Sequence, residues 1–408
     1  MSKYSSEKTK IGEHLKRLIK RDASDFVKSA DKEVGETSGY IAQEAVAAVA
    51  SSDKASSSFM IKSSLPREAG KGITYDERST FIREFITAPL YRRILYSRAP
   101  VISAVEGIIT EGDSLNQGLR SEFIEGFTTL TEVTGGVKGS GDLGDRKELL
   151  KSAEGAEKLF ASMLFLGEYD YGSDNIGVIS ESDGKRVLAK IDHGWSGSVE
   201  FDNSEKILAF LWHSMSAAGY AKDITVDANK FIEAIHQISQ ISDDEIETIA
   251  SARIEEATRM GFDIKGVQFL FGAVQDNGSV TINEKTFGSL EEYSEHLSSN
   301  LKRNRDLLKD LAEGLSKDLA KDSEATKWVD GSWLPDLAVK SSSVGLEDLI
   351  LAEALDKLNV KNLKDFGVEK LDFSDLYDKA DIDEISSVKG KWGSGRTKIR
   401  SGTGKDLL

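Results

Sequence analysis

The sequence predicts an α+β protein whose first part is rich in short strands and whose C-terminal half is mainly helical. Strand-like segments recur before position 192, the first of them SSSFMIKSS at residues 56–64. Helical spacing of apolar residues dominates from residue 205 to residue 320. The chain has 408 residues, of which 39% are hydrophobic, enough to bury a substantial core.

One long helix interrupts the strand-rich part. Apolar residues at helical spacing predict it from Asp76 to about Ser97, where Pro89 can kink it. For GYIAQEAVAAVA at residues 39–50, helix and strand both remain open. After the helix we expect two strands and then a glycine-rich loop, at Val101–Ile109, Leu119–Phe127 and Thr134–Asp145.

A second helix and a hairpin are expected next. The apolar run LFASMLFLG predicts a helix over Arg146–Gly167, and strands at Asn175–Ile179 and Val187–Ile191 flank the turn ESDGK, an Asp-Gly hairpin signal. Helices are then predicted at 205–217, 226–239, 242–260 and 290–320, with a hairpin turn at Asp276-Asn277-Gly278.

The overall charge restricts the classes of partner. A formal net charge of −16 and a pI near 5.0 argue against nucleic-acid binding, which needs clustered Lys and Arg. Residues 1–21 and 388–408 each carry a net charge of +5; we interpret them as solvated tails, or as peripheral contacts to an acidic membrane. The lack of cysteine excludes disulfides and thiolate metal sites and fits a cytoplasmic location, and no apolar signal segment is present.

Three polar residues are expected to meet at the ends of the hairpin. GEYDYGSDNIG places Asp170 five residues before Asn175, ahead of the first strand, and AKIDHGWS places Asp192 directly after the second. Carboxylate and amide oxygens are ligands that Mg²⁺ prefers, so Asn175 and Asp192 can bind a magnesium ion that bridges nucleotide phosphates. Asp170 can then accept or orient an attacking hydroxyl. This pattern predicts ATP and Mg²⁺ as cofactors.

Phosphoryl transfer also needs a cation on the nucleotide phosphates. Lys62, on the strand at 56–64, is the candidate, with Glu84 on the following helix as its ion-pair partner. If both interpretations hold, Lys62 must lie within about 15 Å of Asp192, since the lysine and the metal contact the same phosphates.

The order of these motifs resembles the protein-kinase superfamily, in particular its atypical phosphoinositide 3/4-kinase-like branch and the kinase-like effectors that bacteria secrete into host cells. The residues that carry the resemblance are Lys62, Glu84, the hinge-like LRSEFIEGF at 119–127, D-x4-N at Asp170 and Asn175, and Asp192-His193-Gly194. It implies a bilobal kinase-like fold and a kinase, with ATP bound also by Glu122, Phe123 and Ile124. No histidine precedes Asn175, so His193 is a candidate to share the catalytic role with Asp170.

The resemblance implies a domain plan of a basic segment at 1–25, an N-lobe at 26–127, a C-lobe at 128–325, a helical appendage at 326–387 and a basic tail at 388–408. The expected acceptor is a phosphoinositide head group, with secretion into a host cytosol by a non-Sec route. An acidic stretch after Asp192, at residues 195–205, speaks against an anionic acceptor, so transfer to protein hydroxyls stays open.

Other readings of the same residues remain open. Asp170, Asn175 and Asp192 can be ordinary turn residues, and Lys62 and Glu84 solvated surface groups; an inactive kinase-like scaffold is then the alternative function. GSGDLG at 139–144 matches a dinucleotide fingerprint but lacks the preceding strand, so we interpret it as a linker. The five histidines show no metal-ligand spacing.

Overall fold

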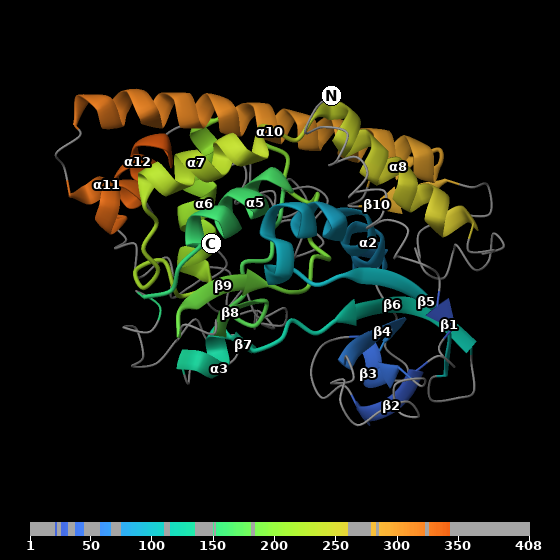
Figure 1. Ribbon diagram of the computed structural model, residues 1–408. Coiled ribbons are helices and arrows are strands. Elements are labelled where there is room, and N and C mark those ends of the chain that lie inside the picture. Colours follow the sequence, from blue (N-terminus) through green and yellow to red (C-terminus); the bar gives the residue numbers. More distant parts are fainter. Residues whose placement is uncertain are drawn as a thin grey trace, which may run out of the picture.

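The chain is a mixed α and β protein with small, largely antiparallel sheets and a helix-rich second half (Figure 1). The computed structural model describes residues 21–22, 26–31, 37–44, 58–66, 75–109, 115–134, 150, 152–180, 184–259, 279–282, 285–322 and 326–342. The basic tail, the predicted turn at 276–278, nearly all of the predicted loop at 134–145, the GSGDLG segment and the appendage beyond residue 342 lie outside these residues.

A six-stranded sheet forms the first layer, with strand order β1-β5-β6-β4-β3-β2. Strand β1 runs parallel to β5, and the other neighbours pair antiparallel. The strands are β1 (Arg21–Asp22), β2 (Phe26–Asp31), β3 (Thr37–Glu44), β4 (Ser58–Pro66), β5 (Ile102–Ile109) and β6 (Leu115–Glu122). The predicted strand at 56–64 is confirmed as β4, and β3 decides in favour of strand for the described part of GYIAQEAVAAVA.

Helix α2 (Tyr75–Leu95) packs against this sheet and confirms the helix predicted from Asp76. Its residues 81–91 are all buried, including Pro89, through which the helix continues. In Figure 1, α2 lies between the six-stranded sheet and the helices of the second half. The helix therefore connects both parts of the molecule through its core.

The strand predicted over Leu119–Phe127 is wrong in its extent. Strand β6 ends at Glu122, and β7 (Phe127–Thr129) belongs to a different, three-stranded sheet with order β7-β8-β9. Between them Gly126 takes a φ of +70°, a left-handed conformation that turns the chain from one sheet to the other. β6 in turn begins at Leu115, four residues before the predicted strand.

The helix predicted over Arg146–Gly167 is shorter than expected. Helix α5 occupies Ala156–Phe165 only, because Gly155 has a φ of +81° and Glu154 forms a β-bridge to Val187. A side chain on Gly155 would also collide with the guanidinium of Arg98, which occupies the space above it. Almost every residue of α5 is buried, so the apolar run marked the core but not the helix start.

The predicted hairpin is confirmed as β8 (Ile176–Ser180) and β9 (Arg186–Lys190), in register with Ile176 opposite Lys190. The C-terminal helices match the predicted ones within two residues at either end. They are α6 (Glu205–Ala217), α7 (Ala228–Ile238), α8 (Asp243–Arg259) and α10 (Leu290–Lys321). The side chains of Asp227 and Ser289 cap the starts of α7 and α10. No helix in the described ranges is both long and apolar enough to cross a bilayer.

Several shorter elements complete the described structure. They are η2 (Tyr96–Arg98), α3 (Leu130–Thr134), β10 (Val280–Ile282), β11 (Lys285–Phe287), α11 (Lys327–Asp330) and α12 (Trp333–Ser342). Strands β10 and β11 pair as a hairpin, and α12 packs on α6. The long helix α10 lies across α7, α5 and α8 and covers the helical half (Figure 1).

Two glycines give opposite predictions for stability. A Cβ on Gly177, in β8, would stand 2.2 Å from the carbonyl oxygen of Thr128 and 2.6 Å from the ring of Phe127, so Gly177→Ala should destabilise the protein by about 1–3 kcal/mol. Gly314, inside α10, has open space where its Cβ would lie, so Gly314→Ala should stabilise it by about 0.5–1 kcal/mol. Denaturant unfolding measures the free energy of unfolding of both variants. A change of the same sign and size in the two would contradict the prediction.

Candidate functional site

Lys62 lies between two carboxylates that come from distant parts of the chain. Its Nζ is 2.8 Å from Glu84 Oε1 in α2 and 3.5 Å from Asp192 Oδ2, which follows β9. The side chains of Lys62 and Glu84 are 13% and 4% exposed, whereas that of Asp192 is 46% exposed. The distance between Lys62 and Asp192 is well inside the limit of about 15 Å that a shared phosphate contact requires.

The two carboxylates determine the charge state of Lys62. Burial lowers the pKa of its ammonium, but the negative charges of Asp192 and Glu84 outweigh burial and raise the pKa above its ordinary value. Lys62 is therefore a cation throughout the physiological pH range. Of its two partners only Asp192 is substantially exposed, so solvent and ligands can approach the Lys62 ammonium from the Asp192 side.

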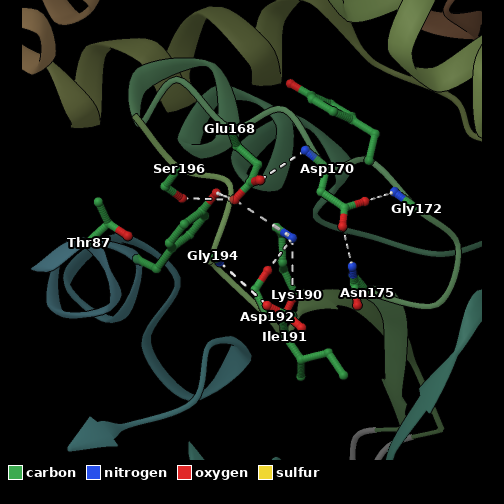
Figure 2. Close-up of polar contacts among 12 residues, drawn as sticks. Thr87, Glu168, Asp170, Gly172, Asn175, Lys190, Ile191, Asp192, Gly194 and Ser196 are labelled. Carbon is green, nitrogen blue, oxygen red and sulfur yellow. Dashed lines mark hydrogen bonds and ion pairs between the residues drawn. The ribbon is translucent and has the colours of Figure 1, made fainter. Parts of the chain in front are cut away.

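Asp170 and Asn175 lie together in the loop before β8 (Figure 2). One carboxylate oxygen of Asp170 accepts a 2.6 Å hydrogen bond from Asn175 Nδ2, and the other accepts one from the Gly172 amide at 2.8 Å. The backbone carbonyl of Asn175 accepts from the Ile191 N–H at 2.9 Å. The hairpin thus places Asn175 beside the residue that precedes Asp192.

The segment around Asp192 has an unusual backbone. Asp192 has a φ of +56°, in the left-handed region that few residues other than glycine, Asn and Asp adopt. Two residues on, Gly194 approaches α2 so closely that a Cβ there would stand 2.8 Å from Thr80 Cβ. Backbone strain and close approach of this kind are frequent at functional sites.

The side chain of His193 is buried in the core, unlike the half-exposed side chain of Asp192 before it. Its side chain is fully buried, and its ring stacks on Tyr91 with centroids 4.0 Å apart and planes at 17°. Neither ring nitrogen has a hydrogen-bond partner within the described ranges. Burial holds the pKa of His193 well below its usual value, so the ring is neutral and packs as a core residue in this structure.

Glu122, Phe123 and Ile124, which were predicted to bind ATP, lie at the end of β6 and in the link that follows it. Glu122 ends β6 opposite Phe59 of β4, and its amide donates to the Val101 carbonyl. Phe123 is one of the most exposed large apolar side chains of the described part, at 48%, and Ile124 accepts a turn hydrogen bond from Phe127. Strand pairing thus connects this link to the strand that carries Lys62.

Two buried charged residues beside the site were missed from the sequence. Glu168 and Lys190 are both fully buried, with Lys190 Nζ 3.8 Å from Glu168 Oε2. Oε1 of Glu168 accepts from the Asp170 amide at 2.9 Å, and Oε2 accepts from the hydroxyls of Ser196 and Tyr91 at 2.8 and 3.1 Å. Figure 2 shows Glu168 between the Asp170 loop and the segment after Asp192.

Lys190 extends this network to the other half of the site. Its Nζ donates to the backbone carbonyl of Asp192 at 2.9 Å and to that of Ile191 at 3.2 Å. Burial raises the pKa of the Glu168 carboxyl above its ordinary value, although the positive charge of Lys190 acts to lower it. The one sequence signal for the pair is that a lysine and a glutamate occur in otherwise apolar runs, at the end of a strand and just after a helix.

The expected metal ligands number only two protein groups. In the residues that the structure describes, no three His, Cys, Asp or Glu side chains gather as a metal site of their own would require. The Asp192 carboxylate and the Asn175 amide are hard oxygen donors that suit Mg²⁺. Such an ion normally takes its remaining ligands from water and substrate phosphates.

Basic residues from the second half approach the acidic segment after Asp192. Glu200 lies 2.7 Å from Lys285 Nζ, 3.3 Å from Arg303 Nη2 and 3.1 Å from His296 Nε2. Burial alone would raise the pKa of Glu200, but Lys285, His296 and Arg303 lower it below its ordinary value. Although residues 195–205 contain no Lys or Arg, basic side chains from distant parts of the chain therefore bring positive charge to this surface.

Comparison with known proteins corrects the expected relationship. The chain is 28% identical over 300 residues to an uncharacterized protein of Rickettsia conorii, which covers 69% of this chain and 38% of the relative. It is 27% identical over 307 residues to one of Rickettsia prowazekii, covering 70% and 45%. The chain thus spans less than half the length of either relative.

A family model, that of the LepB N-terminal domain, matches residues 104–313, just over half of the chain. The matched region contains Asp170, Asn175 and Asp192, while Lys62 and Glu84 precede it. The assignment to the phosphoinositide-kinase-like branch of the protein-kinase superfamily is therefore wrong as a statement of family. The chain belongs to the LepB N-terminal domain family.

Proposed function

We propose that this chain transfers the γ-phosphoryl group of magnesium-bound ATP to an alcohol. The observation that carries the proposal is the position of the Lys62 ammonium, 2.8 Å from Glu84 and 3.5 Å from Asp192. A buried cation next to a half-exposed carboxylate is what a magnesium–phosphate complex needs: the lysine neutralises phosphate oxygens, and the carboxylate binds the metal that bridges them.

The remaining residues of the site have compatible roles. Asn175 would supply a second oxygen for the metal, and Asp170, 2.6 Å from Asn175 Nδ2, would accept the proton that the acceptor hydroxyl loses as its oxygen bonds to the γ-phosphorus and ADP leaves with the electrons of the broken P–O bond. Magnesium contributes charge neutralisation on the phosphates. We assign no proton transfer to His193, because its ring is buried and packed on Tyr91.

The arrangement of the layers supports a two-lobed site. The six-stranded sheet carries Lys62, and Asn175 and Asp192 lie at the ends of the hairpin, with the link Phe123–Gly126 between the two sheets. We infer that the nucleotide binds between these parts, with its base near Phe123 and Ile124 and its phosphates near Lys62.

For the acceptor we favour the hydroxyl of an anionic lipid head group, such as a phosphoinositide. Lys285 and Arg303 both approach Glu200, eight residues after Asp192, and together they carry more positive charge than its single carboxylate cancels. Transfer to a protein hydroxyl is the alternative. Radiolabel transfer from ATP to phosphoinositide vesicles, to vesicles of neutral lipid and to a protein mixture separates the two.

Ligand-induced stabilisation gives a test that needs no acceptor. Wild type should melt at a higher temperature with ATP only when Mg²⁺ is present, gaining about 2.7 kcal/mol at a ligand concentration of about 100 times Kd. Lys62→Met should lose most of this gain, because no cation replaces the ammonium. Lys321→Met, which removes an exposed lysine of α10, should keep it. Equal gains in both variants would contradict the proposed role of Lys62.

A further inference from the structure

The buried charges of Glu168 and Lys190 call for a reason beyond stability. A buried ion pair is often no more stable than apolar residues of the same volume, since desolvation of both charges offsets their attraction. Both side chains have no exposed surface, and each directly follows an apolar run of the sequence. Leu or Met at both positions would satisfy an ordinary core.

The pair contacts the backbone of two residues of the proposed site, Asp170 and Asp192. Glu168 accepts from the amide of Asp170, the proposed base, at 2.9 Å. Lys190 donates to the carbonyl of Asp192, the proposed metal ligand, at 2.9 Å. The link between the two, at 3.8 Å, closes a continuous path from one backbone to the other (Figure 2).

The same network holds the strained part of the backbone. Asp192 keeps its φ of +56° while Lys190 donates to its carbonyl and Ser196, four residues on, donates to Glu168. Tyr91 adds a bond from α2, two turns along the helix from Glu84. Strained conformations persist only where the surroundings determine them through several contacts.

We infer that Glu168 and Lys190 are positioning residues, which set the separation of Asp170 from the metal ligand Asp192 and so the distance between base and metal during transfer. This inference rests on the proposed function. It predicts a specific defect when the pair is removed: Asp192 loses its fixed orientation, so more Mg²⁺ is needed to complete the site.

The test compares Lys190→Met, Glu168→Gln and the double variant by thermal melting and by ATP turnover against Mg²⁺ concentration. Each single variant should melt at a lower temperature, because Lys190→Met in particular leaves a charge buried alone. The double variant buries no charge and should recover most of the melting temperature. Its kcat should nevertheless stay at least about tenfold low, with a raised Mg²⁺ concentration at half-maximal rate.

The Mg²⁺ requirement decides the question. A double variant with the Mg²⁺ requirement of wild type would overturn the inference and leave the proposed function intact, because the pair would then be structural only. A wild type without Mg²⁺-dependent turnover would overturn the proposed function, and the inference with it.

Two further variants keep the test decisive. Tyr91→Phe removes one hydrogen bond to Glu168 and keeps the packing, so it should raise the Mg²⁺ requirement even if the double variant does not fold; an unchanged requirement would then count against the inference. Trp333→Phe, at the start of α12, is the matched control, since it removes a buried donor to the Val226 carbonyl. It should lower the melting temperature without changing the Mg²⁺ requirement.

Discussion

Asp192→Asn is expected to lower phosphoryl transfer by about a hundredfold or more while the protein stays folded. An amide cannot replace the negative charge that holds a metal against phosphate oxygens. The fold should survive because asparagine, like aspartate, tolerates the left-handed φ of +56° found at this position. Turnover and thermal melting with Mg-ATP measure the two effects separately, and most of the ligand-induced stabilisation should disappear.

The matched control for this substitution is Asp202→Asn. Asp202 lies on the same segment, is 73% exposed and pairs only loosely with Lys206 at 3.4 Å. The same chemical change there should leave turnover and ligand stabilisation close to wild type. If Asp192→Asn behaves like this control, Asp192 does not bind the metal and the proposed function loses its support.

Asp170→Asn should lower turnover by about 10²–10⁴-fold and leave the affinity for ATP nearly unchanged. In the proposal this carboxylate contacts the acceptor hydroxyl and not the nucleotide, so only the chemical step depends on it. The asparagine oxygen can still accept the hydrogen bond of the Gly172 amide, which should keep the loop folded. Equilibrium ATP binding and single-turnover transfer measure affinity and chemistry separately.

Asp174→Asn, in the same loop, is the control for this experiment. It should retain both affinity and turnover. A loss of ATP affinity in Asp170→Asn as large as the loss of turnover would show that the residue binds the nucleotide complex, in which case Asp170 would be a metal ligand and not a base.

The parts of the site that could be predicted from the sequence are those where a local sequence pattern and the chemistry of phosphate binding point to the same residues. The Asp-Gly turn and the apolar strands around it gave the hairpin, and the hairpin alone brings Asn175 next to the residue before Asp192. The pairing of Lys62 with Glu84 followed from the chemistry of phosphate binding. The fold was predictable as mixed α and β, while the family assignment drawn from these motifs was wrong.

The features that were missed depend on tertiary context. Hydrophobic periodicity treats lysine and glutamate as surface residues, so it cannot signal that Lys190 and Glu168 are buried together across 22 residues. The start of α5 depends on a bridge from Glu154 to Val187 and on a positive φ at Gly155, neither of which a local pattern contains. The burial of His193 likewise comes from stacking on a helix about 100 residues earlier.

Two contacts of α10 with segments next to the site have a consequence for the order of folding. Its Asn304 donates to the Phe165 carbonyl at the end of α5, and its Leu297 fills the space beside Gly197, so the end of α5 and the segment after Asp192 both contact a helix more than 90 residues further along the chain. Contacts of such high sequence separation form late and slowly, after loop-closure entropy has been overcome. During synthesis Lys62 and Glu84 can pair early, but the end of α5 and the segment after Asp192 make these contacts only after α10 has left the ribosome.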